Sequence, residues 1–298
     1  MFTGCGTALV TPFRTDLSLD EPALRRLVRR QIEAGIDFLV PCGTTGESPT
    51  LARHEHLRVI EISLEEAKGK VPVLGGAGGY STREVIELAR ELEDLGVDGI
   101  LSVTPYYNKP TQEGLYQHYR AIASAISLPV IVYSVQARTG VNVEPATLAR
   151  LAAIPNIVGV KEASGNIAQM ASVMQQVAPE FIVLSGDDAI TLPLMALGGR
   201  GVISVVSNEI PAEMTQLARH CLDGDFASAR ALQRKYLPLM EINFIESNPI
   251  PVKAALGLMG LLETVYRLPM VPPNAEHLAR IEKVLESVGL LGRVPVAG

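Results

Sequence analysis

Short apolar runs recur along the chain, and most of them are rich in Val, Ile and Leu with little polar alternation. Such runs are typical of strands that are buried on both faces of a parallel sheet. Between them lie stretches with apolar residues at i, i+3, i+4 and i+7 that end in Gly, which is the pattern of amphipathic helices. Eight strand-like runs are found, at residues 6–13, 37–43, 71–76, 98–105, 128–134, 156–163, 181–188 and 201–207.

Eight consecutive strand–helix units predict an α/β fold, a (β/α)8 TIM barrel over residues 1–224. An open doubly wound sheet is the alternative, but no G-x-G-x-x-G follows the first run, and the glycine-rich "LGGAGGYS" follows the third. Residues 225–298 contain helical patterns without strands. We interpret them as a C-terminal helical domain on the catalytic barrel, whose apolar faces are equally suited to a subunit interface.

Composition narrows the class of protein. The chain has 298 residues, 47% hydrophobic and 19% charged, with a net charge of -6, so a large core is expected and no basic run is available for nucleic acid. Three distant cysteines, Cys5, Cys42 and Cys221, predict neither disulfides nor a zinc site. No apolar run approaches the roughly 20 residues of a membrane span, and the N-terminus lacks a signal-peptide pattern. We therefore expect a cytoplasmic protein that does not bind membranes.

Polar and aromatic residues close five of the apolar runs. In a (β/α)8 barrel the active site lies at the carboxyl ends of the strands, so these residues are expected to meet at one mouth. They are Thr44 and Thr45 after the second run, Tyr106 and Tyr107 after the fourth, Tyr133 and Arg138 after the fifth, Lys161 at the end of the sixth and "SGDD" after the seventh.

Lys161 ends an apolar run, where an unpaired ammonium group would cost several kcal/mol. Confinement in a partly desolvated pocket lowers the pKa of an amine from about 10.4, which leaves neutral, nucleophilic amine at pH 7. Such an amine condenses with a ketone or aldehyde to form an imine. The alternative is a lysine paired with Glu162, Asp187 or Asp188, although strand alternation directs Glu162 to the opposite side.

Three neighbouring features suit imine chemistry. Tyr133 is placed to deliver the proton that releases water from a carbinolamine, although it is equally suited to be a core aromatic. The "GTTGE" turn at residues 43–47 offers N–H groups and two hydroxyls to a carboxylate. Arg138 is suited to grip a second carboxylate in bidentate fashion, and its alternative is a solvated loop residue.

Metal chemistry is not expected. His54 and His56 are two residues apart on a predicted helix and therefore face different directions. The adjacent Asp187 and Asp188 are more typical of a cap on the following helix than of a metal or glycosidase carboxylate pair.

The chain resembles the superfamily of dihydrodipicolinate synthase and N-acetylneuraminate lyase along almost its whole length. The paired threonines, "TPYYNKP" and the arginine before "TG" favour the dihydrodipicolinate synthase family. The resemblance implies a lyase that condenses pyruvate with L-aspartate 4-semialdehyde to 4-hydroxy-tetrahydrodipicolinate, on the way to diaminopimelate and lysine. The alternative is a pyruvate-dependent aldolase or lyase acting on another 2-keto acid, such as N-acetylneuraminate or a keto-deoxy sugar acid. The segments that carry the resemblance include "FTGCGTALVTPF", "GTTGES", "TPYYNKPTQEGLYQHY", "GVKEASGN", "LSGDD" and "NPIPVKAALGLMG".

The resemblance also implies catalytic roles. Lys161 forms the Schiff base with pyruvate, so no cofactor beyond this covalent imine is expected, and Tyr133, Thr44 and Tyr107 form a proton relay. In the family the tyrosine that matches Tyr107 comes from a neighbouring subunit, which implies a homotetramer built as a dimer of dimers.

Substrate-binding roles follow from the same resemblance. Thr45 binds the pyruvate carboxylate and Arg138 binds the carboxyl of the aldehyde, while the backbone at Gly186 and Ile203 contacts the bound adduct. One departure concerns the loop that carries Arg138. The family usually reads Tyr-Asn-x-Pro where this chain has Ser134 and Gln136, and we expect loss of the proline to free that loop.

A second departure concerns lysine feedback. Ser48, His56, Glu84 and Tyr106 match the lysine-inhibited enzymes of the family. Arg53, however, stands where a histidine is common, and Tyr80 where an asparagine is common. An added cation repels the ammonium groups of lysine and a phenol narrows the cleft, so we predict weak or absent inhibition.

Overall fold

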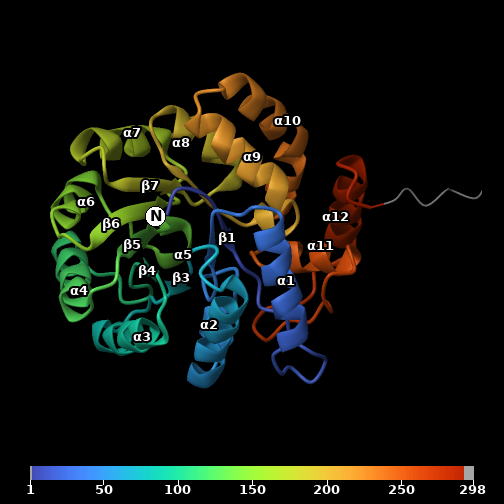
Figure 1. Cartoon of the computed structure of the whole chain (residues 1–298), viewed down its shortest axis with the longest axis horizontal. Coiled ribbons are helices and arrows are strands. Elements are labelled where there is room, and N and C mark those ends of the chain that lie inside the picture. Colours follow the sequence, from blue (N-terminus) through green and yellow to red (C-terminus); the bar gives the residue numbers. More distant parts are fainter. Residues whose placement is uncertain (1, 292–298) are drawn as a thin grey trace, which may run out of the picture.

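Eight parallel strands form a barrel in the computed structural model, which describes residues 2–291 (Figure 1). Their order is β2-β1-β8-β7-β6-β5-β4-β3, and a parallel bridge between Leu39 and Val73 joins the two ends of this order. The predicted barrel is confirmed. The strands are β1 (Gly4–Ala8), β2 (Phe38–Val40), β3 (Leu74–Gly76), β4 (Gly99–Val103), β5 (Val130–Ser134), β6 (Ile157–Glu162), β7 (Ile182–Ser185) and β8 (Gly201–Ser204).

Helices follow the strands and surround the barrel (Figure 1). They are α1 (Glu21–Glu33), α2 (Arg53–Ala67), α3 (Thr82–Leu95), α4 (Gln112–Ala125), α6 (Pro145–Ala152), α7 (Ile167–Gln176), α8 (Thr191–Ala196) and α9 (Pro211–Leu222). Shorter pieces lie in the connections at the strand ends: the 3-10 turns η1 (Ser48–Thr50), η2 (Asp188–Ile190) and η3 (Val206–Asn208), and the helix α5 (Gln136–Thr139). Side-chain caps start several helices, as where Asp20 accepts from the Ala23 N–H at 3.0 Å.

The first strand is shorter than predicted, because β1 ends at Ala8 and residues 9–13 leave the sheet. The Leu9 N–H still reaches the Val40 carbonyl, but the Val10 N–H donates to the side chain of Asn208 at 3.2 Å. The prediction that residues 6–13 form one strand is therefore wrong in its second half. An apolar run alone does not distinguish a strand from the buried loop that continues it.

The barrel interior is filled with apolar side chains. Phe2 and Phe38 meet edge to face with ring centroids 5.6 Å apart, and both are almost fully buried. Gly6 in β1 leaves room for this packing, since a Cβ there would overlap the Phe38 ring. A second apolar layer lies between the sheet and the helices. Side chains in the interior cluster include Phe2, Ala8, Phe38, Val40, Leu74, Leu101, Ile131, Leu184 and Ile203.

Three helices follow the barrel: α10 (Phe226–Ile242), α11 (Ile250–Leu258) and α12 (Ala275–Ser287). α10 packs on α8 and α9, and α11 packs on η3 and α12. Val252 and Leu256 of α11 join Val10 and Val205 in a buried cluster, so this helix is continuous with the barrel core. The predicted helical appendage is confirmed, and the boundary between residues 224 and 225 stays a prediction.

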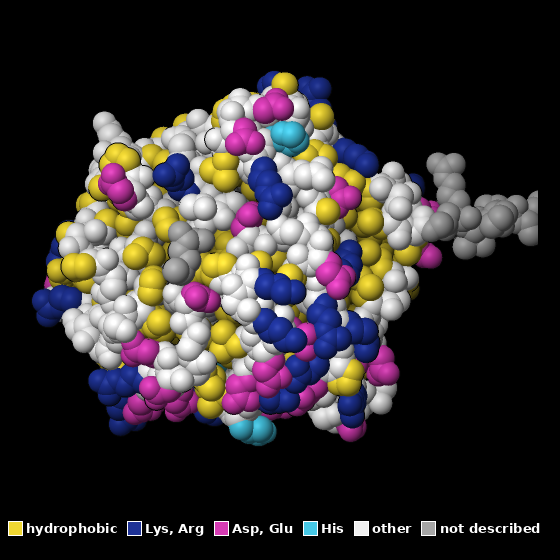
Figure 2. Space-filling model, in the orientation of Figure 1, with side chains coloured by type: hydrophobic (Ala, Val, Ile, Leu, Met, Phe, Trp, Pro, Cys, Tyr) yellow, Lys and Arg dark blue, Asp and Glu magenta, His cyan; other side chains and the backbone are white. Residues whose placement is uncertain are grey.

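Basic and acidic side chains intermingle over α1 and α2 on the face shown in Figure 2. Arg25 and Arg29 of α1 pair with Glu66 of α2, and Arg58 of α2 pairs with Glu21 of α1. Ion pairs at the protein surface each contribute little to the free energy of unfolding. Separately, within residues 2–291 no helix combines the length and the apolarity that crossing a bilayer requires.

Asp188 links the turn after β7 to the end of β8. Its buried Oδ2 accepts from the N–H groups of Val205 and Val206, both at 3.0 Å, while Oδ1 has no partner among the described residues. Burial raises the pKa of this carboxyl from 3.8 to about 6, against the lowering effect of its hydrogen bonds.

We predict a stability term that depends on pH. The folded-state pKa of Asp188 exceeds its unfolded value. The free energy of unfolding of the wild type therefore falls by up to about 3 kcal/mol as the pH rises from about 4 to above 6. Asp188→Asn has no such ionisation. The difference in unfolding free energy, variant minus wild type, should therefore fall by up to about 3 kcal/mol between about pH 7.5 and pH 4. Urea titrations of both proteins measure it, and a difference that does not change with pH would contradict the assignment.

Candidate active site

Lys161 faces a cavity of about 540 Å³ at the carboxyl ends of the strands. Only 5% of the residue is exposed. It stands opposite Tyr133 in the register of β5 and β6, and its Nζ lies 4.3 Å from the centroid of the Tyr133 ring. The structure thus brings the predicted amine and the predicted proton donor to one wall. Residues that line this cavity include Thr44, Thr45, Tyr133, Arg138, Lys161, Gly186, Asp187 and Asn248.

The carboxylates near Lys161 are engaged elsewhere. Glu162 points to the outer side of β6, where its Oε1 accepts from Gln169 at 2.8 Å and its Oε2 from the Ser164 N–H at 3.1 Å. Asp187 caps η2 through the Ala189 N–H, and Asp188 binds backbone N–H groups as described above. These contacts argue against the reading of Lys161 as one half of an ordinary ion pair.

Gly186 gives Lys161 its space. A Cβ at this position would lie 2.6 Å from the Cβ of Ala163 and 3.2 Å from the Cε of Lys161. The Gly186 N–H donates to the Glu162 carbonyl at 2.7 Å, which holds this turn against β6. Ile203, by contrast, lies in the barrel interior and is not among the described residues that line the cavity.

The "GTTGE" turn joins β2 to η1. Its backbone is closed by bonds from Gly46 N–H to the Gly43 carbonyl and from Glu47 N–H to the Thr44 carbonyl, both 3.1 Å. Thr45 is 2% exposed, and its Oγ1 accepts from the side-chain amide of Asn248 at 2.9 Å. The turn therefore presents both threonines to the Lys161 cavity in a fixed backbone conformation.

The segment with Arg138 is not freed, contrary to our expectation. Residues 136–139 form α5, in which the N–H groups of Arg138 and Thr139 donate to the Val135 carbonyl at 3.0 and 3.1 Å. The Arg138 guanidinium donates to the backbone carbonyl of Asn248 at 3.1 Å. Ser134 faces away from the cavity and accepts from the Val143 N–H at 3.1 Å. A helical turn thus supplies the restraint that the missing proline would have given.

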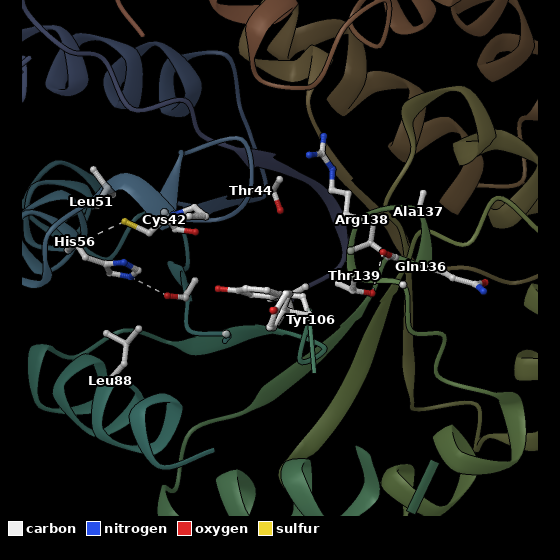
Figure 3. Close-up of a pocket in the computed structure, with 18 of the residues that line it drawn as sticks. Cys42, Thr44, Leu51, His56, Leu88, Tyr106, Gln136, Ala137, Arg138 and Thr139 are labelled. Atoms are coloured by element: carbon white, nitrogen blue, oxygen red, sulfur yellow. Dashed lines mark hydrogen bonds between the residues drawn. The ribbon is translucent and has the colours of Figure 1, made fainter. Parts of the chain in front are cut away.

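A second cavity of about 840 Å³ adjoins the first, and Thr44 and Arg138 line both. Figure 3 shows both side chains among those that line it, Thr44 from the turn after β2 and Arg138 from α5. The predicted feedback residues Ser48, Arg53, His56 and Tyr106 also line it.

The feedback residues differ in their contacts. His56 is buried, its Nε2 is 2.9 Å from the Gly76 carbonyl, and burial lowers its pKa below the usual range (Figure 3). Arg53 pairs with Glu91 at 2.8 Å. Tyr80 packs edge to face on Tyr106 but lies outside the lining, as does Glu84. Within residues 2–291 no three His, Cys, Asp or Glu side chains gather as metal ligands would.

Tyr107, unlike Thr44 and Tyr133, is a predicted relay residue that does not line the Lys161 cavity. It is 93% exposed, its φ is +68°, and it lines the larger cavity instead. Among the described residues, no hydrogen bond joins the hydroxyls of Thr44, Tyr107 and Tyr133. The relay therefore stays a prediction.

Two residues of the C-terminal part were missed in the sequence. Asn248 lines the Lys161 cavity, and Lys253 of α11 is fully buried in an ion pair with Glu47 at 2.6 Å. The signal was present, since a lysine within the apolar helix "IPVKAALGL" requires a partner.

The fold and this site define an enzyme of the (β/α)8-barrel class with a lysine amine at the carboxyl ends of its strands. The model of the Dihydrodipicolinate synthetase family matches residues 1–288. The chain belongs to this family.

Named relatives match this chain along almost its full length. The 4-hydroxy-tetrahydrodipicolinate synthase of Koribacter versatilis is 54% identical over 295 residues, which cover 99% of this chain and 98% of the relative. The crystal structure of dihydrodipicolinate synthase from Thermotoga maritima has a TM-score of 0.96 at 48% identity and covers 98% of this chain and 100% of that one. The chloride-inhibited synthase of Acinetobacter baumannii complexed with pyruvate has a TM-score of 0.96 at 44% identity, with the same coverage.

Proposed function

We propose that the chain is a 4-hydroxy-tetrahydrodipicolinate synthase, a lyase that condenses pyruvate with L-aspartate 4-semialdehyde in lysine and diaminopimelate biosynthesis. One observation carries the proposal: in a chain 54% identical to such a synthase, a lysine that is 5% exposed faces a strand-end cavity beside Tyr133. The pyruvate complex of the Acinetobacter baumannii relative supports the choice of keto acid.

The reaction starts at the Lys161 amine. Its nitrogen attacks the carbonyl carbon of pyruvate, the carbinolamine loses water, and a protonated imine forms. Loss of a methyl proton gives the enamine, whose carbon attacks the aldehyde carbon of the semialdehyde, and the aldehyde oxygen takes up a proton. The amino group of the semialdehyde then attacks the imine carbon, which closes the ring and releases the lysine. One water is lost overall, and no redox partner or cofactor is required.

The neighbouring residues have distinct roles in this proposal. Tyr133, with Thr44 and the Tyr107 of a second copy, moves the proton that releases water. Thr45 binds the pyruvate carboxylate, and the absence of a side chain at Gly186 leaves room for the adduct beside Lys161. Arg138 binds the carboxyl of the semialdehyde, and the backbone at Ile203 contacts the adduct. Because Arg138 lines both cavities, it is suited to receive the second substrate as it enters.

A cytoplasmic location is part of the proposal. The three cysteines, Cys5, Cys42 and Cys221, are buried free thiols, which suits a reducing compartment.

The decisive experiment is trapping with borohydride. Pyruvate and borohydride should irreversibly inactivate the wild type and leave a reduced pyruvate adduct on Lys161 in peptide mass spectra. Lys161→Ala should take no label and lose nearly all activity, whereas Lys109→Ala, which removes an amine of the larger cavity, should still be labelled at residue 161. Turnover of L-aspartate 4-semialdehyde without cleavage of N-acetylneuraminate completes the assignment. An unmodified Lys161 would overturn it.

We infer further that a second copy completes each site, in a homotetramer built as a dimer of dimers. Tyr107 is almost fully exposed in a left-handed conformation, beside the exposed Tyr80 that packs on Tyr106. An aromatic residue held outward in this way is suited to insertion into a neighbouring molecule.

Mixing two inactive variants tests whether Tyr107 acts in the active site of a second copy. If Tyr107 works in the site of its partner, a dimer of one Lys161→Ala chain and one Tyr107→Phe chain contains one intact site. Random exchange of subunits should therefore restore about a quarter of the wild-type sites. Activity equal to the sum of the separate variants, with exchange confirmed by native mass spectrometry, would show that Tyr107 acts within its own chain.

We also propose weak or absent feedback by lysine. Arg53 places a cation at the lining of the larger cavity, although Glu91 offsets part of its charge. Millimolar lysine should leave the wild-type rate almost unchanged, and Arg53→His with Tyr80→Asn should make the enzyme more sensitive. Halving of the wild-type rate by millimolar lysine would contradict the proposal.

A further inference from the structure

The start of α11 contacts the proposed active site at two places. Asn248, just before the helix, is 4% exposed, and Lys253 within the helix is 0% exposed. Both reach residues about 200 positions earlier in the chain, Thr45 and Glu47, which lie in the same tight turn. One short C-terminal segment therefore holds one catalytic turn at two points.

Asn248 connects the two groups that we assign to the two substrate carboxylates. Its side-chain amide donates to the Thr45 hydroxyl at 2.9 Å, and its backbone carbonyl accepts from the Arg138 guanidinium at 3.1 Å. The same residue lines the cavity of Lys161. The distance between the hydroxyl and the guanidinium therefore depends on where Asn248 is held.

Lys253 and Glu47 anchor the other end of the turn. Their 2.6 Å ion pair has side chains 0% and 2% exposed, and the Lys253 Nζ also lies 4.4 Å from the centroid of the Phe13 ring and 5.3 Å from that of Tyr266. Glu47 has a φ of +54°, an unfavourable conformation for a residue with a side chain, so its orientation is set by such contacts.

A buried ion pair is weak evidence for stability. Well-packed apolar residues of similar volume often replace such a pair at no cost to stability, whereas removal of one partner is strongly destabilising because it leaves a buried charge unpaired. The pair is directional, however, and it fixes Glu47 and hence the backbone of the turn. A role in placing the turn is therefore separable from a role in holding the fold together.

We propose that Asn248 and Lys253 are positioning residues for the two substrates. Lys253, through Glu47, holds the turn that binds pyruvate, and Asn248 sets the spacing between Thr45 and Arg138 so that both carboxylates bind at once. This inference rests on the proposed function. It makes the C-terminal helical part a component of substrate recognition.

The ion pair is tested with Glu47→Met combined with Lys253→Met. This double variant replaces both charged side chains with an apolar one of similar volume, so its urea midpoint should stay near that of the wild type. The pyruvate concentration that gives half-maximal borohydride labelling should rise on the order of tenfold, because displacement of a binding group weakens its contact. The KM for the semialdehyde should change less than twofold, roughly, because Arg138 is untouched. Lys235→Met, at an exposed lysine of α10, is the matched control.

Asn248→Ala tests the spacing separately. It should raise the half-labelling concentration of pyruvate and also the KM for the semialdehyde, each on the order of tenfold. Asn243→Ala controls for lost stability, because this buried asparagine bonds Glu209 instead of a site residue, at 2.6 Å. It should lower the urea midpoint and leave both constants unchanged.

The outcomes separate the two proposals. A wild type that takes no label, or that does not turn over the semialdehyde, refutes the proposed function. A wild type that does both, with Asn248→Ala and the double variant folded and unchanged in their constants, refutes the positioning role alone. If the double variant does not fold, Asn248→Ala decides, since equal effects from Asn248→Ala and Asn243→Ala would reduce the role to stability.

Discussion

The parallel direction of the eight strands is the constraint on which this structure depends. In a closed parallel sheet every strand ends at the same rim, so residues from distant parts of the chain meet there without any need to be near in sequence. Side chains alternate along each strand, which places Lys161 in the cavity and Glu162 against α7. The register of β5 and β6 then sets the tyrosine ring beside the amine. The geometry at the rim is thus a direct result of backbone pairing.

The rim is only part of the site, because the segment between α10 and α11 closes one side of it. Asn248 lines the cavity, and α11 is joined to the barrel by apolar packing as well as by its buried lysine. Packing of this kind is not directional and would tolerate small shifts of the helix. The polar contacts are directional, and they are concentrated where the helix meets the "GTTGE" turn. In the proposed positioning role, substrate recognition and folding therefore use different interactions on the same helix.

The local hydrophobic pattern was sufficient to predict the barrel and the orientation of Lys161, since both follow from periods of two and 3.6 residues. It failed where long-range pairing decides the structure. The partner of Lys253 lies 206 residues away in the chain, and no local feature of "GTTGES" indicates it. The restraint on Arg138 was also misjudged, because α5 and the Asn248 carbonyl replace the rigidity of a proline. Tyr107 has no role that a single chain can show.

The aromatic pair in the barrel interior affects how small molecules reach and leave the site. Phe2 and Phe38, with the aliphatic side chains around them, fill the barrel interior among the described residues, so the floor beneath the lysine is packed. Molecules therefore enter and leave the site at the rim formed by the strand ends. A keto acid that stayed unbound would dissociate through the opening by which the aldehyde enters. A keto acid bound covalently to Lys161 stays in the site. In the proposed reaction, a packed floor favours sequential binding, in which the keto acid is bound to Lys161 before the aldehyde arrives.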